Sequence, residues 1–249
     1  MTLFSYTFTT GDLILFYVVA LLIGMAKTGV HGAGMAAVPL LAAVFGGRLS
    51  SGVLLPLLVL ADVLGVRYYH AHASWKDLKV LFPWAALGVV GGAVAGAYIN
   101  DQSFKAIMAV IILVSIGIMV WMQRGKREEV PQNKTFAAAT GIAGGFTSMV
   151  GNLAGSVMAV YLLAMRLPKN AYIGTTAWFF LVTNWFKVPF HVFVWHTITF
   201  NTFLLALTGL PAIALGAWLG IVIVKRIPEN AYRWFIIVTT LIAAVLMFI

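Results

Sequence analysis

The sequence predicts an all-α integral membrane protein built as an inverted repeat of two halves, and three observations lead to that prediction. Of the 249 residues, 62% are hydrophobic and 9% are charged, whereas about a quarter of the residues in soluble domains are charged. Apolar stretches recur from residue 13 onward, with no polar span long enough for a soluble domain. The order of five apolar segments then repeats after one polar linker. These observations exclude a water-soluble monomer.

The predicted N-terminal repeat covers residues 1–122, the cytoplasmic linker 123–135 and the C-terminal repeat 136–249. At an offset of 122 residues, seven identities fall within 24 positions, which run from Gly29 to Gly52 in the first copy. Biased composition is the alternative explanation, but the repeated order of segments favours a duplication. The expected apolar segments lie near 13–27, 35–46, 52–70, 80–99, 104–122, 136–150, 157–165, 172–194, 202–224 and 231–249.

The first two segments of each half are too short to cross a bilayer. We therefore expect each half to be a re-entrant helical hairpin followed by about three transmembrane helices. At about 1.5 Å per residue, segments 35–46 and 157–165 span about 18 and 14 Å, against a hydrocarbon core of about 30 Å. Glycine-rich tips at 29–34 and 151–155 provide the irregular backbone that such a turn requires. Because irregular backbone at membrane depth must be enclosed by protein or face a wet cavity, both tips are expected at the centre.

The distribution of cations supports this layout, because Lys and Arg favour cytoplasmic loops. With the N-terminus outside, two hairpins and six spans place eleven cations on the cytoplasmic side and only Arg48 and Lys105 outside. Lys27, Arg67 and Lys187 lie within apolar segments. Each half then crosses the membrane an odd number of times, so the halves have opposite orientations, a plan found in many secondary transporters.

Two glycine-rich motifs, each followed by a short apolar helix and a glycine-containing span, carry a family resemblance over nearly the whole chain. The first motif is Gly29-Val30-His31-Gly32-Ala33-Gly34 with Pro39, the second is Gly151-Asn152-Leu153-Ala154-Gly155, and the spans contain Gly52 and Gly174-Thr175-Thr176. Together with Gly92-x-x-x-Gly96, the pattern resembles the sulfite exporter TauE/SafE family, also called the 4-toluene sulfonate uptake permease family. The resemblance implies a multi-pass protein of the bacterial inner membrane that transports small organosulfur anions such as sulfite, sulfoacetate or other sulfonates.

The expected function is therefore that of a secondary membrane transporter that works by alternating access. An anion channel is the alternative in the same class, and an intramembrane enzyme is the alternative from another class. No G-x-x-x-x-G-K-[ST], G-x-S-x-G or H-E-x-x-H motif is present, so we expect neither an ATP site nor catalytic residues. Because the chain has no cysteine and its five histidines are scattered, no metal or cofactor is expected.

The expected partners are a small anionic substrate, membrane lipids and, as a candidate coupling ion, protons. Nucleic acid is not expected, because the cations lie in short runs between apolar segments rather than on a basic domain. The sequence leaves open whether the protein imports or exports its substrate and whether it forms a homodimer.

The second helix of each hairpin begins at the tip, so its N-terminus points into the membrane, where its free N–H groups favour an anion. Two such ends, approaching from opposite faces, predict a binding site at the midplane. Alternative roles are helix capping for Ser156 and core filling for Trp178. Asn152 and His31 could equally form hydrogen bonds to the loop backbone instead of contacting the substrate. The candidate substrate-binding residues are Lys27, His31, Gly32, Gly34, Asn152, Ala154, Gly155, Ser156, Thr175 and Trp178.

Asp62, Asn184 and Lys187 lie inside spans and are the candidates for ion coupling. Lys27 stands one turn before the first tip, where an ammonium group is costly unless a ligand, water or counter-ion meets it. For Lys27, the alternatives to substrate attraction are a structural pair with Asp62 and snorkelling. For Asp62, the alternative to proton coupling is a fixed ion pair with Arg67 or Lys27. Asp62 corresponds to Asn184 in the repeat, and Lys187 either lines the pathway or snorkels to the outer surface.

Overall fold

The structure is a computed structural model that describes residues 2–100 and 134–246, together with a few single positions from 102 to 114. Most of the predicted segment 104–122 and of the linker 123–135 lies outside the described residues. The elements are β1 (Thr2–Leu3), β2 (Tyr6–Thr7), α1 (Thr10–Lys27), α2 (His31–Phe45), α3 (Gly47–Tyr69), the 3₁₀ turn η1 (His70–His72), α4 (Trp75–Tyr98), α6 (Lys134–Gly151), α7 (Ala154–Ala164), α8 (Lys169–Phe193), α9 (Phe200–Thr208), α10 (Leu210–Arg226) and α11 (Glu229–Leu246).

The predicted all-α membrane class is confirmed. In the described part of the chain, three helices are long and apolar enough to cross a membrane: Thr10–Lys27, Arg48–His72 and Trp75–Tyr98. The pair α9 and α10 forms a fourth candidate, bent by 51° at Gly209. The predicted continuous segment 202–224 is therefore wrong in detail.

The prediction that the first segment is too short to cross is also wrong. A capping box at Thr9 and Asp12 starts α1 three residues before the predicted position, because each side chain accepts a hydrogen bond from the other's backbone N–H. The resulting helix has 18 residues and is about 27 Å long at 1.5 Å per residue, close to the thickness of a hydrocarbon core.

The helices of each predicted hairpin lie antiparallel, α1 against α2 and α6 against α7. At the open end of the first, the Phe45 ring at the end of α2 lies 5.6 Å from Tyr6 and 5.8 Å from Phe8, just before α1. At the open end of the second, Phe136 in the first turn of α6 stacks on Tyr161 near the end of α7, at 5.8 Å. In each pair, the second helix therefore ends close to the point where the first helix began.

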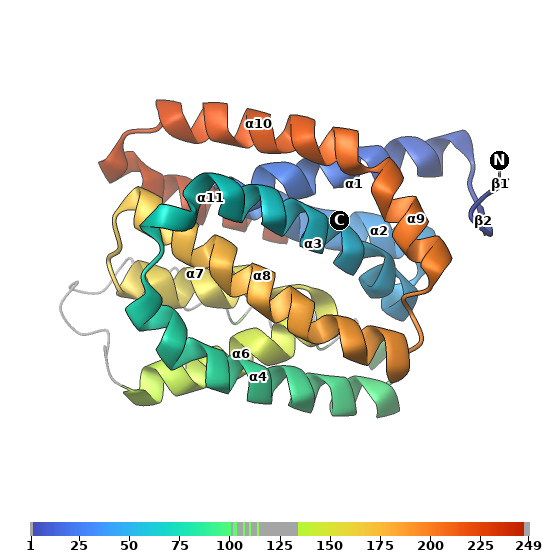
Figure 1. Ribbon diagram of the computed structural model, residues 1–249, viewed down its shortest axis with the longest axis horizontal. Helices are drawn as coiled ribbons and strands as arrows, with labels where there is room; N and C mark the ends of the chain where they lie inside the picture. The colour runs from blue at the N-terminus through green and yellow to red at the C-terminus, as the bar shows by residue number, and fades with distance from the viewer. Residues whose placement is uncertain are drawn as a thin grey trace.

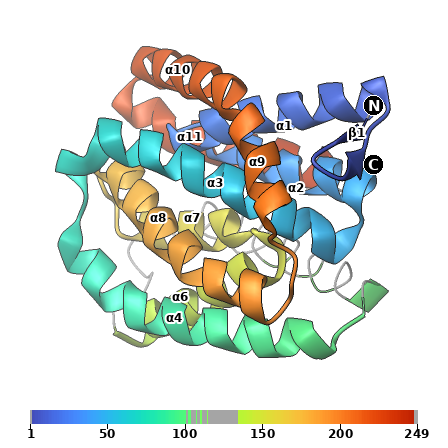
Figure 2. The same cartoon turned by 45° about the vertical axis from the view of Figure 1, so that its right-hand side comes forward.

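The two halves interlock in a reciprocal way. Figures 1 and 2 show α1 and α10 along one edge of the molecule, α4 and α6 along the opposite edge, and α3 and α8 between them. The backbones of these edge pairs approach closely at glycines. A Cβ at Gly216 of α10 would lie 2.0 Å from the Leu21 carbonyl oxygen, and one at Gly145 of α6 would lie 2.0 Å from that of Ala85. Such contacts permit tight packing between apolar helices.

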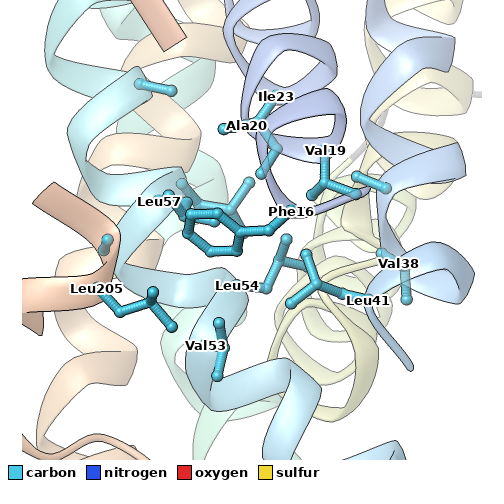
Figure 3. Packing of buried hydrophobic residues seen from close by; sticks show 14 of the residues in the cluster. Phe16, Val19, Ala20, Ile23, Val38, Leu41, Val53, Leu54, Leu57 and Leu205 are labelled. Carbon is cyan, nitrogen blue, oxygen red and sulfur yellow. The ribbon is translucent and has the colours of Figure 1, made fainter. Parts of the chain in front are cut away.

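A buried apolar cluster fixes the first hairpin against the middle of the molecule. Figure 3 shows the Phe16 ring of α1 between Leu57 of α3 and Leu41 of α2, and Ile23, further along α1, and Leu205 of α9 belong to the same cluster. Each of these side chains is at most 2% exposed. Because close packing leaves little room for movement, this cluster holds the end of α1 in a defined place.

We expect residue 72, after α3, to face the cytoplasm and residue 98, at the end of α4, to face outward, since cationic loops stay inside. Both side chains are exposed. The chain contains no cysteine, so the single variants His72→Cys and Tyr98→Cys can be labelled without background. In intact cells an impermeant maleimide should label only the Tyr98→Cys protein, and the reverse pattern would contradict the orientation.

Candidate functional site

The first hairpin turns at residues 28–30, directly after Lys27 ends α1. Gly29 has a φ of +119°, which residues with a side chain rarely adopt. Its carbonyl accepts a 2.9 Å hydrogen bond from the hydroxyl of Tyr232 in α11, and a Cβ at Gly29 would lie 2.7 Å from Val224 of α10. The last two helices therefore hold this tip, and with it the position of Lys27.

The second hairpin turns at Asn152, whose φ of +56° is one that asparagine tolerates better than most residues. The backbone N–H of Asn152 donates to the Ser148 carbonyl at 3.0 Å, and that of Leu153 donates to the Thr147 carbonyl at 3.1 Å, which closes the end of α6. α7 begins two residues later, at Ala154. The N–H groups of its first turn have no acceptor within the helix.

The two tips meet at a small cavity of about 40 Å³. One water molecule needs about 10 to 15 Å³ on this measure, so the cavity has room for about three waters or the head of a small oxyanion. Its lining combines both hairpins with the two central helices: Ala26, Lys27 and Gly34, then Ser148, Asn152 and Gly155, with Leu58 of α3 and Phe180 and Asn184 of α8.

A buried ion pair stands at the cavity wall. The Lys27 ammonium lies 2.8 Å from Asp62 Oδ1, and the two side chains are 8% and 0% exposed. Asn184 donates through Nδ2 to the other carboxylate oxygen, Oδ2, at 2.6 Å. Lys27 Nζ also lies 4.0 Å from the centre of the Phe180 ring, in a cation–π contact. Of the alternatives for Asp62, the ion pair with Lys27 is thus present.

A second lysine lies behind the cavity lining. Lys187 is fully buried, and its ammonium donates to the Ser148 carbonyl at 3.0 Å, to Ser148 Oγ at 3.0 Å and to Asn152 Oδ1 at 2.6 Å. All three partners are neutral oxygens. Of the two alternatives for Lys187, snorkelling to the outer surface is wrong, because the side chain turns inward to the end of α6.

The charges around the cavity do not balance. With all three groups ionised, Lys27, Lys187 and Asp62 would together carry a net charge of +1, and no carboxylate pairs with Lys187 among the described residues. An uncompensated charge is unfavourable in a medium of low dielectric constant. An anion in the cavity would offset it, and a cation there would be repelled.

A family model for the sulfite exporter TauE/SafE matches residues 16–247, nearly the whole chain. The chain belongs to the TauE/SafE family. This family comprises membrane transporters of sulfur anions such as sulfite, so the resemblance that the glycine-rich motifs indicated is confirmed. Searches among curated proteins and among solved structures found no significant match.

In this TauE/SafE chain the cavity brings together four predicted binding residues, Lys27, Gly34, Asn152 and Gly155, and the predicted coupling residue Asn184. These residues come from four helices and one turn, which are far apart in the sequence. At this cavity the cationic side chain of the first hairpin meets the polar side chains of the second.

Other predicted binding residues lie near the tips but do not line the cavity. A Cβ at Gly32 would lie 2.1 Å from the Thr239 carbonyl oxygen of α11, so this glycine serves helix packing. Ala154 is fully buried, and the Ser156 hydroxyl donates to the Leu153 carbonyl at 3.2 Å rather than capping α7. His31 begins α2, and its side chain lies outside the described part of the structure.

Thr175 and Trp178 lie near the beginning of α4, away from the cavity. The Thr175 hydroxyl accepts a hydrogen bond from the Ser74 backbone N–H at 2.8 Å, and the Trp178 ring lies 5.0 Å from that of Trp75. Neither lines the cavity between the tips.

Sequence reasoning missed Ser148 and Phe180 in the TauE/SafE cavity. Phe180, Asn184 and Lys187 are four and three residues apart, which places them on one face of α8, and this spacing was a usable signal. Ser148 had no such signal, because serine inside a helix commonly bonds to the preceding turn.

Proposed function

We propose that this protein is a secondary carrier of small organosulfur anions, such as sulfite or sulfoacetate, and that it works by alternating access. The observation that carries the proposal is that two lysines, Lys27 and Lys187, and only one carboxylate, that of Asp62, lie beside the cavity between the two hairpin tips in the described part of the chain. Lys27 supplies an ammonium group at the lining, and the first turn of α7 supplies backbone N–H groups. Both kinds of group stabilise negative charge.

The relation between the halves supports alternating access. Asp62 and Asn184 are 122 residues apart, the offset of the repeat, and they are hydrogen-bonded to each other across the molecule. Under the same repeat, α1 corresponds to α6 and α10 to α4, so the packing of α1 on α10 repeats the packing of α6 on α4. Two halves that exchange equivalent conformations would open one common site first to one side and then to the other.

The ion pair and the size of the cavity favour a carrier over a channel. A channel needs a continuous wet path, whereas the buried ion pair and the Phe180 ring lie beside a cavity of about 40 Å³. A carrier also needs no nucleophile or base at its site. The lining residues are apolar, amide, hydroxyl and ammonium groups, which suit binding rather than bond cleavage.

Transport into proteoliposomes tests the proposal. Labelled sulfite, sulfoacetate and a taurine-like sulfonate would be offered with and without a pH gradient, and with unlabelled substrate on the opposite side. A carrier accelerates exchange when unlabelled substrate is present on the far side, whereas a channel does not, and recovered label that is chemically unchanged argues against an enzyme. Uptake of cations or neutral solutes alone would overturn the proposal.

We expect Gly155→Leu to abolish this uptake, because a Cβ at Gly155 meets no atom within 4 Å and a larger side chain would fill the cavity. Gly91 of α4 is the matched control, since a Cβ there also meets nothing within 4 Å, but the residue is exposed on the helix surface. Gly91→Leu should transport at the parent rate. Equal uptake by both variants would place the substrate elsewhere.

A further inference from the structure

The hydrogen bonds of Lys187 determine which way the neighbouring polar groups face. An ammonium group has three hydrogens and no lone pair, so every atom that it contacts must be an acceptor. Its contacts are the Ser148 carbonyl, Ser148 Oγ and Asn152 Oδ1, at 2.6 to 3.0 Å. All three hydrogens are therefore used, and the oxygen of the Asn152 amide must be the atom on the Lys187 side.

The donor groups of Asn152 and Ser148 must then point away from Lys187. Asn152 turns its Nδ2 group away from Lys187 and donates to Ser51, to Oγ at 3.1 Å and to the backbone carbonyl at 3.5 Å. The Ser148 hydroxyl accepts from Lys187, so its own hydrogen has to be donated in another direction, and in the described part of the chain no acceptor for it is found. Both side chains line the cavity. Lys187 thus turns the hydrogens of both residues away from itself, and the hydroxyl hydrogen of Ser148 is the one for which no acceptor is found in the described part of the chain.

Other groups at the cavity lining have the same polarity. The Lys27 ammonium can only donate, and the free N–H groups at the start of α7, including that of Gly155, also donate. Asn184 differs, because its Nδ2 donates to Asp62 and its Oδ1 is left as an acceptor. A ligand oxygen that carries no hydrogen can accept hydrogen bonds from most of these groups. A ligand hydroxyl group would instead point its hydrogen at the hydrogen of a donor.

We propose that Lys187 is a positioning residue that turns Ser148 and Asn152 into hydrogen-bond donors and thereby selects anions whose oxygens carry no hydrogen. Sulfonates and fully ionised sulfite belong to this class, and monoprotonated phosphonates do not. The inference rests on the proposed function, because it requires that the anion occupy this cavity.

Two monoanions of the same shape test the inference. Methanesulfonate has three oxygens without hydrogen, and methylphosphonate, at a pH where it carries one charge, has one P–OH group. Binding of each to the purified protein in nanodiscs would be measured by calorimetry. We expect the parent to bind methanesulfonate about tenfold more tightly or more, because a polar group left without a partner in a dry site weakens binding strongly.

Lys187→Met keeps an unbranched side chain, one atom shorter than lysine, and removes all three donors, so the Asn152 amide is free to turn over and offer its oxygen. The preference for methanesulfonate should then fall to about threefold or less, since the lining can also accept. Lys79→Met is the control, because Lys79 is an exposed lysine of α4, and it should keep the parent preference. If Lys187→Met does not fold, Ser148→Ala decides: losing one donor should weaken methanesulfonate binding and lower the preference.

The outcomes separate the inference from the proposed function. A parent protein that binds both anions equally, or a Lys187→Met protein that keeps the parent preference while both affinities fall, overturns the positioning role but leaves an anion carrier. A Ser148→Ala protein with the parent preference also overturns it. A parent protein that binds neither of these anions nor sulfite overturns the proposed function itself.

Discussion

Lys27→Met is expected to lower the free energy of unfolding by about 3 to 5 kcal/mol, because removing one member of a buried ion pair leaves the other uncompensated. Asp62 would keep its hydrogen bond from Asn184, but its carboxylate, which is 0% exposed, would lose the ammonium 2.8 Å away. Unfolding in detergent, followed by tryptophan fluorescence, measures the loss.

The double variant Lys27→Met with Asp62→Asn separates stability from binding. Both charges are then gone, so the free energy of unfolding should return to within about 1 kcal/mol of the parent value. Anion binding should not return. Without the ammonium at the lining, sulfite affinity should stay about tenfold to a hundredfold below that of the parent, as expected for one lost charge-assisted hydrogen bond.

Lys225→Met is the control, because Lys225 is also a lysine over an aromatic ring, 5.5 Å from the centre of Tyr68, but it is exposed. It should change stability by less than about 1 kcal/mol and leave sulfite affinity unchanged. Lys27→Arg should be milder than Lys27→Met. A double variant that binds sulfite as tightly as the parent would show that Lys27 has only the structural role that was its alternative.

The site was partly predictable because its main features are short sequence motifs or follow from the internal repeat. Glycine-rich tips between short apolar runs indicated two hairpins, and the offset of 122 residues paired Asp62 with Asn184 before any contact was known. The pairing of Lys27 with Asp62 was one of the predicted alternatives, because a charged side chain inside a membrane protein is energetically unfavourable unless it has a partner.

What sequence reasoning could not supply was the direction of side chains and the reason for each glycine. Gly34 lines the cavity and Gly32, two residues earlier, packs on α11, yet both belong to the same motif. A glycine permits close approach of a ligand or of a helix, and only the neighbours decide between the two. In the same way, Lys187 turned inward because Ser148 and Asn152 offer three oxygens at the end of α6.

Two helix boundaries were predicted wrongly from the apolar pattern, although local sequence signals marked both of them. The capping box at Thr9 and Asp12 begins α1, and Gly209 with the proline at 211 separates α9 from α10. In a chain with mean hydropathy of +0.99, segments run together by composition, so capping signals mark the true boundaries better than hydropathy does.

Asp62→Asn alone is expected to tighten anion binding by about tenfold or more, because the Lys27 ammonium loses its internal counter-ion and the local charge becomes more positive by one unit. Without an anion the variant should be less stable than the parent by about 3 to 5 kcal/mol, because the Lys27 charge is then unpaired. Saturating sulfite should restore more stability to this variant than to the parent, since a ligand stabilises the state that it binds. Asp77→Asn at the start of α4 removes the same charge far from the cavity and should show neither effect.

The same variant tests proton coupling, since asparagine resembles an aspartic acid that has taken up a proton. The groups that face Asp62 are Lys27 and Asn184, with Lys187 acting on it at longer range. If a proton on Asp62 releases Lys27 to the anion, proton and anion enter together, and a variant fixed in the protonated-like form cannot use a pH gradient. Asp62→Asn should therefore keep sulfite exchange between the two sides of a proteoliposome and lose the acceleration by an imposed pH gradient. Uptake that still responds to the gradient as in the parent would leave Asp62 as the structural partner of Lys27 and nothing more.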